Sequence, residues 1–140
     1  MSRKKIAVVF GTRPDTIKMA PVILELRKEA ESLDIVTIAT AQHRQMLDQV
    51  LQVFQIVPDH DLNVMKPMQT LAEITKNVID ALDQVLVVEK PDMVLVQGDT
   101  TTTFVGSLAA FYRGIPVGHV EAGLRTNDRS NPFPEEINRR

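Results

Sequence analysis

Apolar residues along this chain fall into four short runs separated by longer polar and mixed stretches. The runs are rich in β-branched residues and predict strands at residues 6–10, 35–39, 93–97 and 116–120. Each is a continuous apolar segment, which is typical of parallel strands that are buried on both faces. Residues 55–69 predict a long loop, with a short edge strand near 62–65.

Between the runs, apolar residues recur at the three- and four-residue spacing of amphipathic helices. The longest such stripe covers residues 71 to about 88, and Thr70 with Glu73 gives it a T-x-x-E capping box. Three shorter helices are predicted from residue 15 onward, between residues 42 and 54, and from the threonine run at 100–103 to Gly114.

Single residues set two further expectations for these helices. Pro21 should kink or restart the first helix, because proline lacks the backbone N–H that a helix interior requires. In the last helix, the aromatic and aliphatic residues Phe104, Leu108 and Phe111 lie on one face, and Gly114 marks the end.

Strands that alternate with helices predict a parallel sheet covered by helices on both faces, which is a Rossmann-like α/β fold. Ligands of such sheets bind at the carboxyl ends of the strands. Four polar segments follow the predicted strands at that edge: residues 11–15, 40–45, 98–100 and 119–125. Their joint position favours a ligand site there more strongly than any one loop does.

The composition is that of a globular protein. The 140 residues suffice for one domain with a core; 44% of them are apolar and 24% are charged. The net charge of −2 argues against a nucleic-acid surface, and no apolar run is long enough to span a membrane. The basic N-terminus lacks the cleavage site of a signal peptide. The absence of cysteine excludes disulfides and thiolate metal sites, and fits the cytoplasm as the expected compartment.

The segment Gly11-Thr12-Arg13-Pro14 joins the first strand to the first helix. Pro14 suits the first helical position, and free N–H groups at this helix start could receive an anion. Arg13 adds a cation with a planar donor fork. A plain strand-to-helix turn with a surface arginine is the alternative. Because the segment is neither G-x-G-x-x-G nor a Walker A loop, neither a dinucleotide cofactor nor P-loop chemistry is expected, and no other cofactor is indicated.

Asp99 and the four threonines at 100–103 stand where the last helix begins. Asp99 is placed as a helix N-cap, and hydroxyls in the first turn can meet unsatisfied N–H groups or a ligand. Capping alone needs one such residue. Five in sequence therefore favour a polar ligand.

His119 and Glu121 stand two positions apart at the end of the last predicted strand, which should point both side chains to the same face. A metal site needs more ligands than this pair, and the other histidines of the chain are His43 and His60. No metal is therefore expected.

Acid–base chemistry is the alternative to a metal. Glu121, Asp99 and the pair Glu135 and Glu136 could share one cleft, where burial and like charges would raise a carboxyl pKa. A solvated acidic face is the other interpretation of the glutamate pair. The Asn-Pro-Phe-Pro segment at 131–134 weakens that interpretation, because two prolines and an aromatic residue hold the loop in a defined path.

These motifs together resemble a known family. The segments FGTRPDTIKMAP, TAQHRQMLDQVLQVF, DLNVM, VLVQGDTTTTFVGSLAAFYRGIPVGHVEAGLRT and PFPEEINR are similar, in this order, to the bacterial non-hydrolysing UDP-N-acetylglucosamine 2-epimerases. The resemblance covers essentially all 140 residues. It implies one half of the two-domain GT-B fold: residues 1–140 correspond to the N-terminal Rossmann-like domain, and a C-terminal UDP-binding domain is absent from this chain.

The resemblance also implies an activity. Members of this family interconvert UDP-GlcNAc and UDP-ManNAc, by anti elimination of UDP to 2-acetamidoglucal and re-addition, for bacterial surface polysaccharide synthesis. By the same resemblance, the catalytic carboxylates are Asp99, Glu121 and Glu135, and the isolated domain is expected to be inactive. The residues expected to bind substrate are Arg13 near the diphosphate, Thr100, Thr101, His119 and Arg125.

The family further implies partners. A second UDP-GlcNAc molecule can act as an allosteric activator, and the matching residues here are Gln42, His43, Gln45 and Glu136. Met68 stands where some members carry an arginine, and Asp15 replaces the more usual glutamate. The full-length enzyme is expected to be a homodimer without nucleic-acid or membrane partners. A hydrolysing relative that releases ManNAc and UDP, and a non-catalytic nucleotide-sugar-binding module, are the alternatives.

Overall fold

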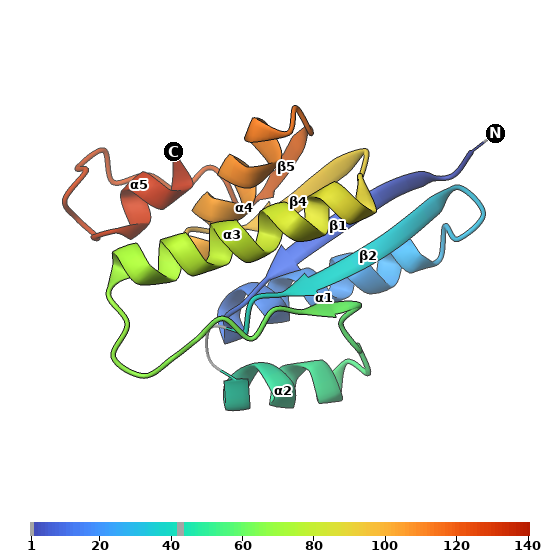
Figure 1. Ribbon diagram of the computed structural model, residues 1–140, viewed down its shortest axis with the longest axis horizontal. Helices are drawn as coiled ribbons and strands as arrows, with labels where there is room; N and C mark the ends of the chain where they lie inside the picture. Colours follow the sequence, from blue (N-terminus) through green and yellow to red (C-terminus); the bar gives the residue numbers. More distant parts are fainter. Residues whose placement is uncertain (1, 42–43) are drawn as a thin grey trace.

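A five-stranded parallel sheet forms the centre of the computed structural model, which describes residues 2–41 and 44–140. The strands lie in the order β3-β2-β1-β4-β5 (Figure 1). Their bounds are β1 Lys4–Phe10, β2 Leu33–Ala39, β3 His60–Asp61, β4 Met93–Gln97 and β5 Val117–Val120. The predicted Rossmann-like α/β fold is confirmed. The strand order reverses between β1 and β4, and ligands of such sheets bind at that point.

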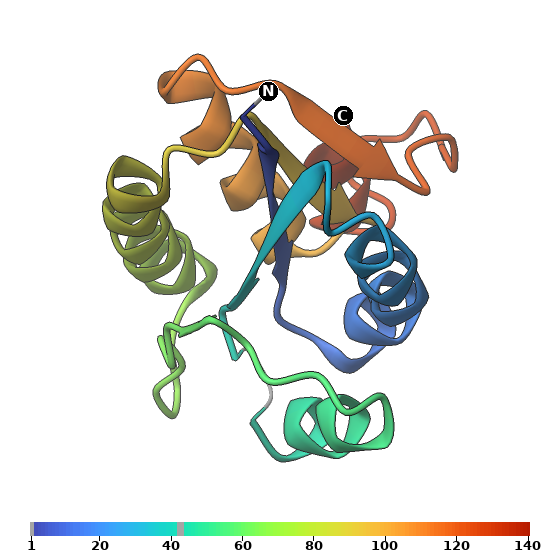
Figure 2. The ribbon, with the colours of Figure 1, turned by 90° about the vertical axis from the view of Figure 1, so that its right-hand side faces the viewer.

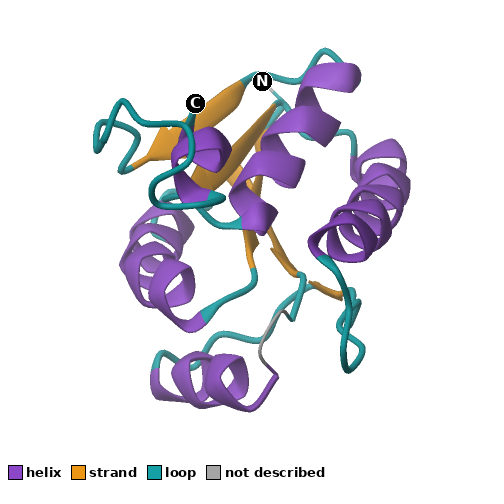
Figure 3. Cartoon of the chain, turned by 90° about the vertical axis from the view of Figure 1, so that its left-hand side faces the viewer, coloured by secondary structure: helices purple, strands orange, loops and turns teal. Residues whose placement is uncertain are grey.

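Helices cover both faces of the sheet, as Figure 3 shows with strands in orange and helices in purple. They are α1 Arg13–Arg27, α2 Arg44–Val53, α3 Leu71–Glu89, α4 Thr101–Tyr112 and α5 Glu135–Arg139. Helices α1 and α2 pack on one face, and α3 and α4 pack on the other (Figure 2). Among the described residues, no helix is long and apolar enough to cross a lipid bilayer.

The central strand β1 supplies side chains to two hydrophobic cores. Ala7 and Val9 belong to the core under α3 and α4, whereas Val8 and Phe10 belong to the core under α1 and α2. This alternation is the two-residue period of a strand, and burial on both faces explains why the run is continuously apolar.

The long helix α3 begins as its sequence predicts. The Thr70 hydroxyl accepts a hydrogen bond from the Glu73 backbone N–H at 3.2 Å, and the Glu73 carboxylate accepts one from the Thr70 N–H at 2.7 Å. The predicted capping box is therefore confirmed, and the helix runs to Glu89.

Pro21 lies inside α1, which continues without interruption from Arg13 to Arg27. The predicted restart of the helix at this proline is therefore wrong. Pro21 is exposed, and the carbonyl that loses its helical donor belongs to Ile17, whose residue is 41% exposed. Water can reach that carbonyl on the outer face, so the missing hydrogen bond does not leave a buried polar group unsatisfied.

The predicted edge strand near 62–65 is wrong in position, because β3 is the two-residue segment His60–Asp61. It pairs in parallel with the end of β2. The Asp59 carboxylate accepts hydrogen bonds from the Thr37 backbone N–H at 2.8 Å and from the Thr37 hydroxyl at 3.0 Å. These bonds fix the register at His60 and draw the strand toward the start of the loop.

The apolar stripe of α4 faces the core only in part, because Phe104 packs against the core but Phe111 does not. Phe104 and Leu108 are half-buried, and Phe111 is 74% exposed. Smaller residues, Val105 and Ala109 among them, contact the sheet instead and are buried. A helix with small residues on its inner face can lie close to the strands, so its larger residues turn outward.

Candidate active site

Carboxylates from three segments meet at the carboxyl end of the sheet. Asp99 follows β4, Glu121 follows β5, and Glu135 is the first residue of α5. Asp99 and Glu135 line one cavity of about 240 Å³. The other lining residues are Thr12, Leu71, Thr100, Thr101, Pro134 and Asn138.

This cavity contains unused polar atoms. Glu135 Oε2 and Thr12 Oγ1 are buried and have no hydrogen-bond partner among the described residues. Buried polar atoms without partners are rare in folded proteins, and they frequently mark ligand or water sites. The cavity is therefore suited to a ligand with hydroxyl or amide groups.

Arg139 joins two of the three carboxylates. Its Nη2 atom lies 3.2 Å from Asp99 Oδ2 and 3.2 Å from Glu121 Oε1. The prediction that Asp99 and Glu121 share one site agrees with this geometry. Arg139 itself was not predicted, although its position four residues after Glu135 places both on one face of α5.

Glu121 is held by further donors. The Lys18 ammonium lies 2.5 Å from Glu121 Oε2, and the Gln97 amide donates to the same oxygen at 3.0 Å. The hydrogen bond from Lys18 and the positive charges of Lys18 and Arg139 lower the pKa of this carboxyl below its ordinary value of 4.5. The expectation of a raised pKa is wrong for Glu121, because cations surround it and screen it from the other carboxylates.

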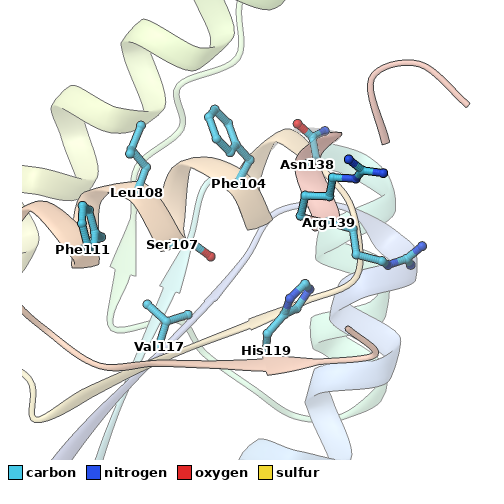
Figure 4. A pocket seen from close by; sticks show the side chains of 9 residues that line it. Phe104, Ser107, Leu108, Phe111, Val117, His119, Asn138 and Arg139 are labelled. Atoms are coloured by element: carbon cyan, nitrogen blue, oxygen red, sulfur yellow. The ribbon is translucent and has the colours of Figure 1, made fainter. Parts of the chain in front are cut away.

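The side chains of His119 and Glu121 do not point to the same side of the sheet. Figure 4 shows His119 beside α4 and Arg139, in a second cavity of about 260 Å³, whereas Glu121 reaches Lys18 in α1. Glu121 has a φ of 61°, which takes the chain out of the strand and ends the alternation of faces. The prediction of a common face is therefore wrong.

The His119 ring has a defined hydrogen bond. Its Nε2 atom lies 2.7 Å from the Gly98 carbonyl oxygen, which can only accept, so Nε2 carries the hydrogen. This bond connects β5 to the turn that precedes Asp99. Among the residues that the structure describes, no three histidines and carboxylates form a group that could hold a metal ion.

Thr100, and not Asp99, is the N-cap of α4. The Thr100 hydroxyl accepts a hydrogen bond from the Thr103 backbone N–H at 3.2 Å. The Thr103 hydroxyl donates to the Gln97 carbonyl at 2.5 Å. Because Thr100 supplies the cap, the Asp99 side chain is released from that role and turns toward Arg139.

The middle of the threonine run packs against β1 and β2. The Thr102 hydroxyl lies 3.0 Å from the Thr40 hydroxyl. Gly11 passes beside both, and a Cβ at this glycine would lie 1.9 Å from Thr40 Oγ1 and 2.8 Å from Thr102 Oγ1. The run is thus mostly structural, and Thr100 and Thr101 are its members that line the cavity.

The turn between β1 and α1 is closed by its own carboxylate. Asp15 is 2% exposed and accepts hydrogen bonds from the backbone N–H groups of Thr12 at 2.8 Å and Gly11 at 3.2 Å. The N–H groups of the two residues that precede the helix are therefore occupied by Asp15. Burial raises the pKa of the Asp15 carboxyl, although these hydrogen bonds oppose the shift. Arg13 is exposed at the helix start, and Pro14 occupies the second helical position rather than the first.

Two of the residues expected to bind an activator, Gln42 and His43, lie outside the described residues. Gln45 is exposed in the first turn of α2. The start of this helix is fixed by Arg44, whose guanidinium makes two hydrogen bonds to the Asp61 carboxylate, at 2.7 and 2.6 Å. This contact was not predicted, because it joins α2 to β3, a strand that the apolar pattern placed at the wrong residues.

Glu136 is 2% exposed and lies away from the cavity. Its carboxylate accepts hydrogen bonds from the backbone N–H groups of Thr126 at 2.9 Å and Asn127 at 3.3 Å. It therefore holds the loop after β5 in place. Arg125 is exposed in the same loop, and its expected contact with substrate stays a prediction.

Comparison with known proteins identifies the family. The family model described as UDP-N-acetylglucosamine 2-epimerase matches residues 25–140. The chain belongs to this family. The resemblance seen in the motifs is therefore confirmed at the level of the family.

Several relatives are highly similar to this member of the epimerase family. UDP-N-acetylglucosamine 2-epimerase of Bacillus subtilis (strain 168) is 64% identical over 139 residues, which is 99% of this chain and 36% of the relative. The enzyme of the same name from Neisseria meningitidis serogroup A is 64% identical over 136 residues, 97% of this chain and 36% of the relative. The chain thus spans about 36% of the length of these curated relatives.

A solved structure is also similar throughout. The crystal structure of UDP-GlcNAc 2-epimerase from Neisseria meningitidis bound to UDP-GlcNAc superposes with a TM-score of 0.92 at 62% identity. The match covers 96% of this chain and 36% of that one. A likeness of this extent shows that the chain shares the fold of the matched part of that structure.

Proposed function

We propose that residues 1–140 are the N-terminal domain of a GT-B, two-domain UDP-N-acetylglucosamine 2-epimerase of the non-hydrolysing type. The enzyme would interconvert UDP-GlcNAc and UDP-ManNAc. One observation carries the proposal: Asp99 and Glu121 meet at one guanidinium, at the carboxyl ends of neighbouring strands, beside a cavity that contains Glu135. Membership of the epimerase family supports the assignment of substrate.

The reaction explains the need for several carboxylates. The proton on C2 of the sugar is not acidic, so departure of UDP from C1 must lead and leaves oxocarbenium character at C1. A carboxylate takes the C2 proton, the C2–H electron pair becomes the C1–C2 double bond, and 2-acetamidoglucal forms. Re-addition of UDP at C1, with proton delivery to the other face of C2, gives the epimer.

The proposed roles follow from where each residue lies. Ionised Glu121 suits a stabiliser of positive charge at C1, because its cationic neighbours hold its pKa below 4.5 and keep it charged. Asp99 and Glu135 stand on the cavity wall. The residues proposed to bind substrate are Arg13, Thr100, Thr101, His119 and Arg125.

Further parts of the proposal concern partners. A second domain would supply most of the uridine and diphosphate site. The complete enzyme is proposed to be a cytoplasmic homodimer that serves bacterial surface polysaccharide synthesis. A second UDP-GlcNAc molecule would act as an activator through Gln42, His43 and Gln45, whereas the buried Glu136 would support the loop after β5 rather than contact this ligand.

Product analysis of the two-domain enzyme in D₂O tests the reaction. UDP-GlcNAc should give UDP-ManNAc with deuterium at C2 in both sugars, because the proton removed at C2 exchanges with solvent. Free ManNAc as the main product would support the hydrolysing alternative instead. Epimerisation that survives both Asp99→Asn and Glu121→Gln would favour a non-catalytic domain.

The 140-residue chain provides a second test. It should show no epimerisation alone, because the cavity at the carboxyl edge is open and most of the nucleotide site is proposed to lie elsewhere. Full activity of this chain would contradict the need for a second domain.

A further inference from the structure

A single buried arginine connects the segments that carry the three carboxylates. Arg139 is 9% exposed, and Figure 4 shows it at the end of α5, next to His119 and α4. Its Nη2 atom contacts Asp99 and Glu121, each at 3.2 Å. Its Nη1 atom donates to the Leu124 carbonyl at 3.2 Å, within the loop after β5.

The same helix carries the third carboxylate. Glu135 begins α5, and Asn138 in this helix donates to the Asp99 carbonyl at 3.0 Å. The five-residue helix has little stability of its own, so its contacts with the sheet edge determine where it sits. Arg139 and Asn138 supply polar contacts of this kind and thereby bring Glu135 to the cavity shared with Asp99.

The charges around Arg139 explain why an arginine suits this position. Asp99 and Glu121 are like charges that both lie 3.2 Å from one nitrogen, and a cation between them offsets their mutual repulsion. A guanidinium stays charged and presents several N–H donors in one plane. Lysine has one ammonium group and would be unable to serve Asp99, Glu121 and the Leu124 carbonyl with the same geometry.

We infer that Arg139 is a positioning residue that fixes the separation of Asp99 and Glu121 and docks the helix that carries Glu135. The inference rests on the proposed function for its catalytic meaning, but the positioning itself is a property of this chain. Lys18 differs in role, because it contacts Glu121 and makes no hydrogen bond or ion pair with Asp99 in the described part of the chain.

The direct test is carboxyl ¹³C NMR of the 140-residue chain, titrated with acid. In Arg139→Gln, the Glu121 titration midpoint should rise toward the ordinary value and the Asp99 carboxyl signal should change position. Lys18→Met should raise the Glu121 midpoint and leave the Asp99 signal in place. Arg140→Gln is the matched control, because the neighbouring Arg140 contacts Glu136 instead and should leave both signals unchanged. Unchanged Asp99 and Glu121 signals in folded Arg139→Gln would overturn the inference.

Kinetics of the two-domain enzyme extend the test. Arg139→Gln should lower kcat by about 10²-fold with a smaller change in KM, as expected when catalytic groups are misplaced by about 1 Å. It should also move the acidic limb of the pH profile upward. Arg139→Lys should restore part of the rate, and it serves in both experiments if the glutamine variant does not fold. A lysine variant with wild-type rate and pH profile would overturn the inference.

The two experiments separate the possible failures. If the NMR signals respond as expected but the product is not UDP-ManNAc, the proposed function is wrong and the positioning role stands. If the enzyme epimerises but Arg139→Gln leaves both the signals and the pH profile unchanged, the positioning role is wrong and the proposed function stands.

Discussion

Asp15 in the first turn of α1 and Glu121 after β5 are both carboxylates at the carboxyl edge of the same sheet. Asp15 is buried, and its oxygens accept backbone N–H groups of its own turn. Glu121 is partly exposed and meets the side chains of Lys18, Gln97 and Arg139. The first carboxylate closes a turn, whereas the second remains open to a ligand. Position at this edge therefore does not by itself distinguish a functional carboxylate from a structural one. The hydrogen-bond partners of its oxygens make that distinction.

Glu135 and Glu136 repeat this contrast within two adjacent residues. Glu136 is buried and holds two backbone N–H groups of the loop after β5. Glu135 faces the cavity, with one oxygen that has no partner among the described residues. Residues adjacent in a helix point about 100° apart, so one glutamate supports the loop and the other faces the site.

The largest expected effect is on catalysis and comes from neutralising Glu121. Glu121→Gln in the two-domain enzyme should lower kcat by about 10²–10³-fold, because a negative charge proposed to stabilise the transition state is lost while the shape of the side chain is kept. Circular dichroism should show an unchanged fold. A variant that keeps wild-type kcat would place Glu121 with the structural carboxylates.

Removal of the Asp15 carboxylate should instead lower the stability of the fold. Asp15→Ala should lower the free energy of unfolding by about 1–3 kcal/mol, because two buried N–H groups lose their acceptor. Urea denaturation of the 140-residue chain measures this value. Asp15→Asn keeps one acceptor oxygen and should lose less; equal losses in both variants would contradict the role assigned to these hydrogen bonds.

A related prediction follows from the close packing around Gly11 in the same region. Gly11→Ala should destabilise the chain by about 1–3 kcal/mol, because the new Cβ would overlap the Thr40 and Thr102 hydroxyls. Gly123→Ala is the control, since a Cβ there meets nothing within 4 Å. Equal urea midpoints for the two variants would show that the turn relaxes more easily than its contacts indicate.

The cap of α4 should make a smaller contribution. Thr100→Ala should cost about 1 kcal/mol of stability, because the Thr103 N–H loses its acceptor. Thr100→Ser keeps the hydroxyl and should remain close to wild type in the same denaturation experiment. Equal stabilities of Thr100→Ala and wild type would contradict the capping role of Thr100.

The smallest expected effect is a difference between the carboxyl pKa values of Glu121 and Asp15, each relative to its ordinary value. The Glu121 carboxyl should titrate below 4.5, and the Asp15 carboxyl above 3.8, in a ¹³C NMR pH series. With these signs, Glu121 contributes stability that is present above pH 4.5 and is lost as the pH falls through its lower folded pKa. Asp15 acts in the opposite sense: stability decreases as the pH rises from 3.8 through its raised folded pKa. Midpoints shifted in the same direction would contradict the contrast between the two sites.

Local patterns in the sequence determined most of the fold. Continuous apolar runs identified β1, β2, β4 and β5. Burial explains the apolar composition of β1, β2 and β4, whereas the edge strand β5 is exposed or half-buried along its length. The Thr70 capping box located the start of α3, because both of its hydrogen bonds join residues three apart. The alternation of strands and helices then required a parallel sheet, and the motif strings identified the family.

Tertiary structure alone decided which polar groups act together. Lys18 reaches Glu121 from 103 residues away, and Arg139 reaches Asp99 from another element; no periodicity connects such pairs. The sequence placed Asp99, Glu121 and Glu135 at one edge, but it could not show that cations lower the pKa of Glu121 or that Asp15 fills the N–H groups of its own turn. The residues that set helix caps and apolar burial lie close together in the sequence. The electrostatic field at a side chain, in contrast, depends on every element packed around it.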